Sequence, residues 1–153
     1  FKEENICELT RLVLADWIIK FEGNNINFNF DIPEKALFIL IDKNAYDRII
    51  NNLLANMIKH SHANKLVVQV TEEISEVQIA ISDNGVGIDE AELPFIFDRL
   101  YKCGTSRTEN SNGLGLAITK ELTIAHNGTI NVISGYGKGT TFKLRFPKNM
   151  KKA

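Results

Sequence analysis

The residues of this sequence that could do chemistry are most conspicuous in the stretch DNGVG, residues 83–87. Asp83 ends an alternating apolar run, and Gly85 and Gly87 follow it at a spacing of two. A carboxylate at the end of a strand can accept a hydrogen bond from an exocyclic amine. Glycine has no Cβ and tolerates positive φ, so this pair would let a planar ring lie against the backbone. A glycine-rich turn with a capping acid is the alternative interpretation, and the stretch alone does not separate the two.

A second set of candidate residues lies on a helix predicted over 46–61. Its apolar residues recur at the helical period and leave Asn52, Asn56 and Lys59 together on the opposite face. Asparagine is unfavourable inside helices because its amide competes for backbone hydrogen bonds. An amide oxygen suits Mg²⁺, and a lysine one turn further on could meet a phosphate. Taken alone, the helix is explained equally well by a solvated polar face.

The long stretch 99–112 has almost no apolar residues and includes Arg99, Lys102 and Arg107. Loops of this length in a compact domain are usually functional or disordered. The stretch continues into NGLGLAI, where Gly113 and Gly115 open a predicted helix, and helix N-termini bind anions. These features favour a basic lid over phosphates, with a solvated loop as the alternative.

Two familiar ion and phosphate sites are excluded by their spacing. An EF-hand that starts at Asp83 would need oxygen ligands at its third and fifth positions and glycine at its sixth, but Gly85, Gly87 and Ile88 stand there. The one Gly-Lys pair has Val132 where a P-loop needs its first glycine. The two cysteines and three histidines form no zinc-binding pattern.

The composition of the chain is that of an ordinary globular domain. Its 153 residues are 44% hydrophobic and 24% charged, with a net charge of -1. This balance gives no basic field for nucleic acid or for an anionic membrane, and no apolar run is long enough to span a bilayer. The chain begins with Phe1 rather than methionine, so we expect a piece of a longer protein.

The elements that must position the candidate residues follow from hydrophobic periodicity. Helices are predicted over 5–21, over 42–60 with Asp42 as the N-cap, and over 113–126, ended by Asn127-Gly128. Strands are predicted over 26–32 and, as a short buried strand, over 36–42, with hairpins of 65–73 with 76–83 and of 129–134 with 140–146. Because several strands alternate, we expect a two-layer α/β sandwich, a mixed and mostly antiparallel sheet with helices packed on one face.

Together these motifs resemble the ATP-binding catalytic domain of sensor histidine kinases, in the Bergerat-fold superfamily. The match runs from about Asp42 to Phe146 with the motifs in the familiar order. NNLLANMIKHS is similar to the N box, DNGVGI to the first glycine box and FIFDRLYK to the F box. NGLGLAI is similar to the second glycine box, although Ser111-Asn112 stand where further glycines are common, and GKGTTF to the closing glycine-threonine element.

The resemblance implies a role for each matching residue. Asn56 would hold Mg²⁺, Asp83 would bond the adenine amino group, and Thr140 would support the adenine end. Phe95 and Phe97 would anchor the start of an ATP lid over 99–112. The residues implied in ATP binding are Asn52, Asn56, Lys59, His60, Asp83, Gly85, Gly87, Ile88, Arg99, Tyr101, Lys102, Gly113, Leu114, Gly115, Leu116 and Thr140.

The implied activity is that of a bacterial protein histidine kinase. The domain would bind Mg-ATP and donate the γ-phosphate to a histidine on a separate dimerisation domain, as part of two-component signal transduction. Relatives that hydrolyse ATP carry a water-activating glutamate where this chain has Asn52, and an amide cannot act as a general base. We expect neither His60 nor His62 to be the phosphoacceptor, so the chain holds no self-contained catalytic set. An anti-sigma-factor-type serine kinase and a non-catalytic ATP-dependent regulatory module are the alternatives.

The resemblance also implies an organisation. Residues 1–153 would be a single ATP-binding catalytic domain with a lead-in helix over 1–24 and the lid over 99–112, as a fragment of a longer sensor kinase. Its partners would be the dimerisation domain of the same protein and a response regulator, with no nucleic acid. We expect a homodimeric full-length protein, which leaves the fragment itself free to be monomeric, and a cytoplasmic domain of a membrane-anchored sensor.

Overall fold

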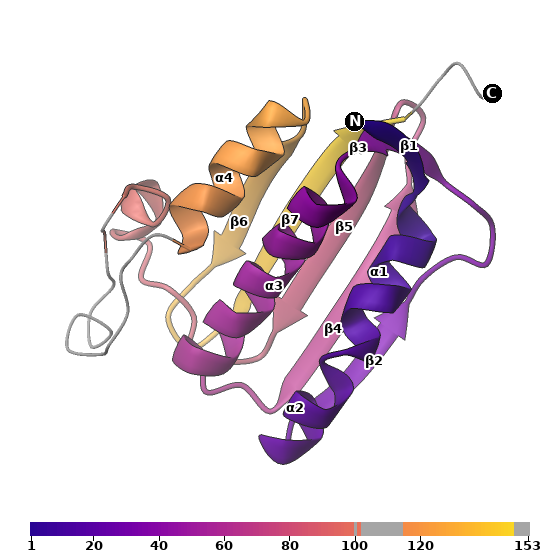
Figure 1. Ribbon diagram of the computed structural model, residues 1–153. Coiled ribbons are helices and arrows are strands. Elements are labelled where there is room, and N and C mark those ends of the chain that lie inside the picture. The colour runs from indigo at the N-terminus through magenta and orange to yellow at the C-terminus, as the bar shows by residue number, and fades with distance from the viewer. Residues whose placement is uncertain (100, 102–114, 149–153) are drawn as a thin grey trace.

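The sheet and the helices of this protein form two layers, and Figure 1 shows the helices side by side on one face of the sheet. The computed structural model describes residues 1–99, 101 and 115–148. The strands are β1 (Lys2–Asn5), β2 (Asn27–Asp31), β3 (Phe38–Ile41), β4 (Lys65–Glu72), β5 (Glu76–Asp83), β6 (Thr129–Ser134) and β7 (Thr140–Pro147). The helices are α1 (Ile6–Ala15), α2 (Ile18–Gly23), α3 (Lys43–His60) and α4 (Gly115–Ala125), with a short 3₁₀ helix, η1, at Leu93–Phe95.

The main sheet has the strand order β2-β4-β5-β7-β6. β2 runs parallel to β4, and the three other pairings are antiparallel. β1 and β3 form a separate two-stranded antiparallel sheet. The predicted two-layer sandwich, with a mixed and mostly antiparallel sheet and helices on one face, is confirmed, and both predicted hairpins are present.

Alternation along the strands explains why the helices cover one face. On β4, Leu66, Val68 and Val70 are buried, whereas Val67 and Gln69 between them are exposed. β7 alternates in the same manner. Burying one large aliphatic side chain contributes about 1.5–3 kcal/mol. The apolar face of the sheet therefore holds the helical layer in place.

The central helix α3 agrees with the prediction over 42–60. Asp42 is its N-cap, and its carboxylate accepts a hydrogen bond from the N–H of Asn44 at 3.0 Å. The helix ends where the hydroxyl of Ser61 donates to the carbonyl of Met57 at 2.8 Å. Its apolar stripe faces the core, so its polar residues are left along the sides.

The N-terminal segment differs from the single helix predicted over 5–21. Residues 2–5 instead form β1, and the helix is interrupted between Ala15 and Ile18. The side-chain oxygen of Asn5 accepts hydrogen bonds from the N–H groups of Cys7 at 3.1 Å and Leu37 at 3.2 Å, which fixes the helix start. The pairing of β1 with β3 joins distant parts of the sequence, so local periodicity gave no sign of it.

The prediction that 36–42 is a buried strand is wrong on one face. Ile39 and Ile41 are fully buried, but Phe38 and Leu40 are 38% and 49% exposed. β3 lies in the small sheet with β1 rather than inside the main sheet, and this leaves its outer face to solvent.

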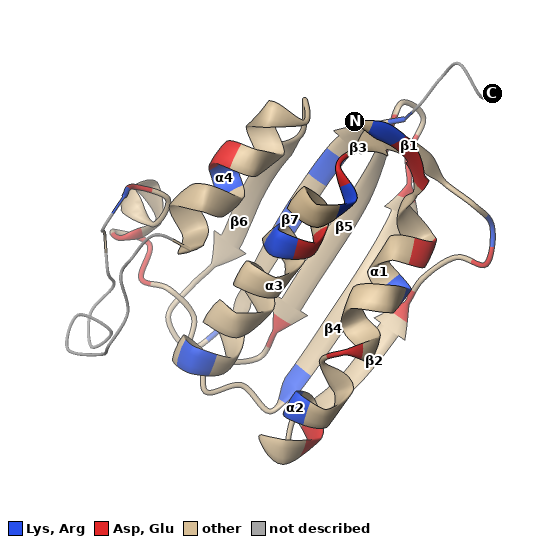
Figure 2. Ribbon diagram, in the orientation of Figure 1, with Lys and Arg blue, Asp and Glu red and all other residues tan. Residues whose placement is uncertain are grey.

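Charged residues are interspersed over the surface of the fold. Figure 2 shows basic and acidic residues mixed along the helices and at the strand ends. Among the described residues, no helix combines the length and the apolar character that crossing a membrane requires.

Candidate functional site

The candidate site lies at the end of the main sheet where β5 stops and β7 starts. Asp83 is opposite Thr140 in the strand register, and Thr140 is opposite Ser134 on β6. Opposed residues share a face of the sheet, as do residues two apart along one strand. The three side chains therefore lie on the helix-covered face, in line with the buried Ile81 and Phe142. At this end of the strands the apolar core gives way to a row of three polar residues, Asp83–Thr140–Ser134, which we call the polar row.

Asp83 is the carboxylate of this row and is half-buried. Burial raises the pKa of its carboxyl above the ordinary value, and backbone hydrogen bonds from Gly85 and Thr140 partly oppose the rise. The N–H of Gly85 donates to Oδ1 at 2.8 Å. A carboxyl that is partly desolvated and held in one orientation is suited to recognising a single hydrogen-bond donor.

Ser134 is the residue of this row that sequence reasoning missed. Its hydroxyl donates to the carbonyl of Gly139 at 2.8 Å and accepts from the N–H of Ile88 at 2.7 Å. Its oxygen also lies 2.8 Å from Oγ1 of Thr140. The signal available in the sequence was its position at the end of the strand 129–134, immediately before the glycines of GYGKGT.

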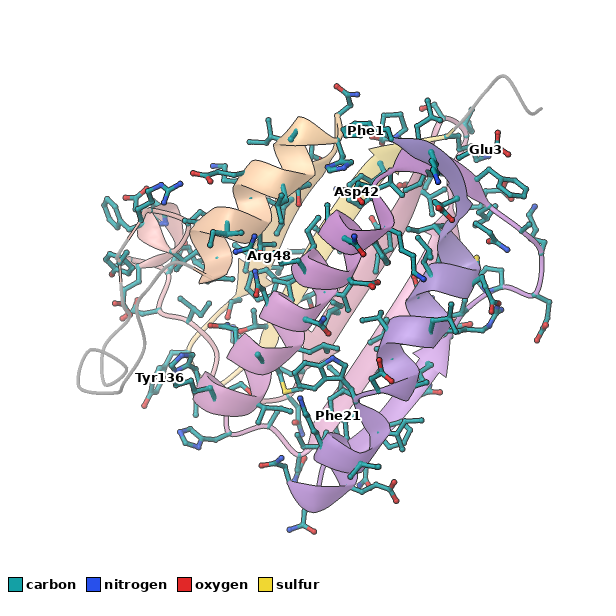
Figure 3. The ribbon with its side chains drawn as sticks, viewed as in Figure 1. Phe1, Glu3, Phe21, Asp42, Arg48 and Tyr136 are labelled. Atoms are coloured by element: carbon teal, nitrogen blue, oxygen red, sulfur yellow. The ribbon has the colours of Figure 1, made fainter. Side chains whose placement is uncertain are left out.

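The turn that follows Asp83 is clamped between α3 and the β6–β7 turn. The N–H of Val86 donates to the carbonyl of Ser61 at 2.7 Å, and the carbonyl of Val86 accepts from the N–H of Gly137 at 2.6 Å. Tyr136 of the β6–β7 turn lies at the same end of the molecule as the C-terminus of α3 (Figure 3). The turn after β5, the C-terminal end of α3 and the β6–β7 turn are thus bonded to one another, and we call this region the junction.

The glycines of this turn are required by the packing of the junction. A Cβ on Gly85 would overlap the carbonyl oxygen of Ser61, and a Cβ on Gly87 would overlap that of Gly135. Gly87 also has a φ of +76°, which side chains disfavour. We predicted that the missing Cβ atoms make room for a ring, but protein backbone occupies those positions. Contact with a ring stays a prediction, and the glycine pair is explained without it.

Three of the four asparagines of α3, namely Asn51, Asn52 and Asn56, have different surroundings. Asn51 accepts a hydrogen bond from Nε1 of Trp17 at 2.7 Å, so it holds the break between α1 and α2. Nδ2 of Asn52 lies 3.4 Å from the carbonyl oxygen of Gly115 and joins α3 to the start of α4. Asn56 lies one turn further along the helix and is half-buried. Asn52 therefore connects two helices. The predicted role of Asn56 in holding Mg²⁺ stays a prediction.

The last turn of α3 brings two basic residues next to the glycine turn. Lys59 is exposed and His60 is half-buried. Both precede Ser61, whose carbonyl holds Val86. The helix end therefore places basic groups and the DNGVG turn on the same side of the molecule.

The segment after the turn is anchored by aromatic contacts. The ring of Phe97 packs edge-on against Phe142, with 6.4 Å between centroids, and Nζ of Lys120 on α4 lies 5.5 Å from the Phe97 centroid. Phe95 is 48% exposed and its ring lies 6.0 Å from that of Tyr101. The predicted anchoring role fits Phe97, whereas Phe95 lies on the surface.

Arg99 and Tyr101, both predicted in ATP binding, contact carboxylates in this structure. One guanidinium nitrogen of Arg99 lies 2.8 Å and 2.9 Å from the two carboxylate oxygens of Glu121 on α4. The hydroxyl of Tyr101 donates to Glu92 at 2.8 Å. Direct contact of either residue with a nucleotide stays a prediction.

The remaining predicted residues divide into two groups. Gly115 and Leu116 lie in the first turn of α4. Lys102, Gly113 and Leu114, together with nearly all of the predicted lid over 99–112, lie outside the described residues.

The described residues contain no cluster of three or more His, Cys, Asp or Glu side chains that could hold a metal ion by themselves. Mg²⁺ keeps several waters and takes one or two protein oxygens together with substrate phosphates. The half-buried amide of Asn56 fits this mode, because it supplies one neutral oxygen ligand. The acid, hydroxyls and amides of the site are suited to binding and orienting a ligand with a donor at one end and anionic groups at the other.

Comparison with known proteins gives one family match and several relatives. Residues 41–150 match the family model described as "Histidine kinase-, DNA gyrase B-, and HSP90-like ATPase". The sensor histidine kinase WalK of Bacillus subtilis (strain 168) is 34% identical over 128 residues, which are 80% of this chain and 21% of WalK. The chain thus spans about a fifth of the length of that relative.

Solved structures of similar fold include two that contain ThkA. The catalytic domain of histidine kinase ThkA, in a nucleotide-free form, has a TM-score of 0.83 at 26% identity and covers 100% of this chain and 99% of that chain. ThkA in complex with the response regulator protein TrrA has a TM-score of 0.81 at 24% identity, over 100% of this chain and 43% of that chain.

Proposed function

This chain belongs to the histidine kinase-, DNA gyrase B- and HSP90-like ATPase family, and from that premise we propose that it binds Mg-ATP and donates the γ-phosphate to a histidine on a separate dimerisation domain. The resemblance identified from the sequence is confirmed at the level of the family. The observation that carries the proposal is the polar row Asp83–Thr140–Ser134, which ends the sheet beside a turn that is bonded to Ser61 at the end of α3.

The adenine base would bind at the polar row. Asp83 would accept a hydrogen bond from the exocyclic amine, since its carboxyl is held by Gly85 and partly desolvated. The turn that carries Asp83 is clamped to α3 and to the β6–β7 turn, so the carboxyl is oriented before any ligand arrives. A site ordered in advance loses less conformational entropy on binding.

The phosphates would lie toward the last turns of α3 and the start of α4. Asn56 would hold Mg²⁺ together with phosphate oxygens, and the bound metal would neutralise part of the phosphate charge. Lys59 and His60, in the last turn of α3, would contact the phosphates or the ribose, and Lys59 would add positive charge at this end. Lys102, Gly113 and Leu114 would contribute from the segment outside the described residues.

Transfer to an outside histidine is favoured over hydrolysis by the surroundings of Asn52. Its Nδ2 lies 3.4 Å from the carbonyl of Gly115, where a hydrolytic relative would need a carboxylate to activate water. An amide offers no general base near neutral pH. Phosphoryl transfer depends mainly on alignment and charge neutralisation, which such a site can supply to a nucleophile on another domain.

The wider organisation is part of the same proposal. The acceptor histidine would lie on a dimerisation domain of the full-length protein, which would be a homodimer anchored in the membrane with this domain in the cytoplasm. The resulting phosphohistidine would pass its phosphate to a response regulator, and the ThkA–TrrA complex supports a partner of this kind.

The experiment is transfer of label from γ-³²P-ATP to a dimerisation-domain fragment of the full-length protein, with ATP binding measured in parallel by calorimetry. We expect magnesium-dependent label on the histidine with the wild-type domain. Asn56→Ala should lose the magnesium dependence of binding, whereas Asn51→Ala on the same helix, directed at Trp17, serves as the matched control. ATP binding without label on the acceptor would refute the kinase proposal.

A further inference from the structure

The hydroxyl proton of Ser134 is already used in a hydrogen bond to a backbone carbonyl. A serine hydroxyl can donate one hydrogen bond and accept two. The carbonyl of Gly139 can only accept, so the proton of Ser134 lies on that bond, at 2.8 Å. The N–H of Ile88 can only donate, and it uses one acceptor position of Ser134 at 2.7 Å.

The assignment of Ser134 fixes the hydroxyl of Thr140. Oγ1 of Thr140 lies 2.8 Å from Oγ of Ser134, and one of the two oxygens must donate. Since the proton of Ser134 is used on Gly139, Thr140 is the donor. Thr140 thus turns its one hydroxyl proton toward Ser134 and away from Asp83, which is opposite it on β5.

From this arrangement we infer that Ser134 is a specificity-determining residue that makes the edge formed by Asp83 and Thr140 an acceptor of hydrogen bonds and not a donor. The inference rests on the proposed function, because it concerns the base that this edge would bind. Ser134 is a positioning residue in this role, since it acts through the hydroxyl of Thr140.

An acceptor edge selects one class of purine. A 6-amino purine presents an exocyclic N–H at the position where a 6-oxo purine presents a carbonyl oxygen. The oxygens of Asp83 and Thr140 would pair with the amine, whereas they would face the carbonyl without any proton between them. An unpaired polar group in a partly desolvated site costs more than a hydrogen bond gains, so the discrimination is against the wrong base.

Removing the Ser134 hydroxyl would release the proton of Thr140. In Ser134→Ala, Oγ1–H of Thr140 could rotate toward the ligand and donate to a 6-oxo group. A residue that served only to hold the turn at Ile88 would weaken both classes of purine alike. The ratio of two affinities therefore separates selection of the base from support of the fold.

The test measures the dissociation constants of ATP and inosine triphosphate, which carry the same phosphates, by calorimetry with magnesium. For wild type we expect a clear preference for ATP, and for Ser134→Ala a preference reduced about 5- to 30-fold, which corresponds to one misplaced hydrogen bond. Ser134→Thr, which keeps a hydroxyl, should retain the wild-type ratio.

The control removes the hydroxyl through which Ser134 acts. In a Thr140→Val background, Ser134→Ala should leave the ratio of the two affinities unchanged. An equal loss of both nucleotides in Ser134→Ala, or a change of ratio that persists in the Thr140→Val background, would overturn the inference while leaving the proposed function intact. Wild-type protein that binds neither nucleotide would overturn the proposed function, and this inference with it.

Discussion

In the polar row, Asp83, Thr140 and Ser134 are opposed across three strands. In the segment that follows the glycine turn, Arg99 contacts the carboxylate of Glu121, and Tyr101 contacts that of Glu92. Thr140 is buried, and the neighbouring turn is held by backbone bonds to α3 and to the β6–β7 turn. Arg99 and Glu121 are instead 60% and 54% exposed. Buried hydrogen-bonded groups resist rearrangement, whereas exposed ion pairs contribute about 0–1 kcal/mol and break easily.

This difference separates a rigid region from an adaptable one. The polar row is built into the sheet, so it can recognise a ligand without rearranging. The exposed contact of Arg99 with Glu121 can exchange for others at little cost in free energy. We call the polar row with its glycine turn, 83–87, the fixed end, and the Arg99–Glu121 pair the adaptable end. Substitutions in the two ends test this contrast, and the largest effect is expected first.

The strongest test of the fixed end is Gly87→Ala. The added Cβ would overlap the carbonyl oxygen of Gly135 at a φ of +76°. Overpacking against backbone adds to the strain of a left-handed residue, so we expect a loss of about 3 kcal/mol or more in the free energy of unfolding. Urea denaturation followed by circular dichroism measures it.

Gly137→Ala provides the matched control for Gly87→Ala. Gly137 has nearly the same φ, +78°, but a Cβ there would meet nothing within 4 Å. We expect the strain alone to reduce the free energy of unfolding by about 1–2 kcal/mol. Equal losses in the two variants would show that the junction can yield, and the fixed end would then be no more rigid than an open turn.

Asp83→Asn should have the next largest effect, on binding. The amide keeps the size of the carboxyl but offers one acceptor oxygen and a donor that would face the base amine. We expect ATP affinity to fall about 100-fold or more. Calorimetry measures the affinity, and a circular dichroism spectrum like that of wild type confirms the fold; near-normal affinity would remove Asp83 from base recognition.

The raised pKa of Asp83 predicts a pH dependence of stability. The folded state holds the proton more tightly than the unfolded chain, whose ordinary pKa is 3.8, because burial disfavours the charged carboxyl. Wild-type protein should therefore lose stability as the pH rises through the folded pKa and regain it as the pH falls, a change absent in Asp83→Asn.

Urea unfolding of wild type and Asp83→Asn at about pH 7 and about pH 4 measures this linkage. Relative to wild type, the variant should be more stable at the higher pH than at the lower one. A stability difference that does not change with pH would show that Asp83 is not desolvated as the structure indicates.

The smallest effect is expected at the adaptable end, for Glu121→Gln. The side chains of both partners, Arg99 and Glu121, are exposed to solvent. Loss of their ion pair should therefore change the free energy of unfolding by less than about 1 kcal/mol. ATP affinity should change by less than about threefold. A large loss in either measurement would place Arg99 and Glu121 in the fixed part of the site and remove the contrast.

Prediction from sequence was most successful where the signal was local. The period of the apolar residues and the capping Asp42 located α3, and alternation located both hairpins. It failed where distant residues decide the outcome: β1 exists because it pairs with β3, and the half-exposed Leu40 follows from that pairing.

The candidate site shows the same limit. Asp83 and Thr140 could be identified in advance, because they lie in motifs with recognisable spacing. Ser134 could not, because its importance comes from bonds to Gly139, Thr140 and Ile88 that bring two loops together. Arg99 carried the expected charge, but its contact with Glu121 depends on where α4 lies.

By itself, the sequence determined the helices α3 and α4, the two hairpins, the acid at the end of β5 and the two glycines after it, because the signal for each lies in neighbouring residues. Only the tertiary structure decided what the glycines are for. Backbone carbonyls of Ser61 and Gly135 occupy the places where Cβ atoms would stand. It also decided which side chains are opposed to Asp83, since strand register joins residues that no local period connects.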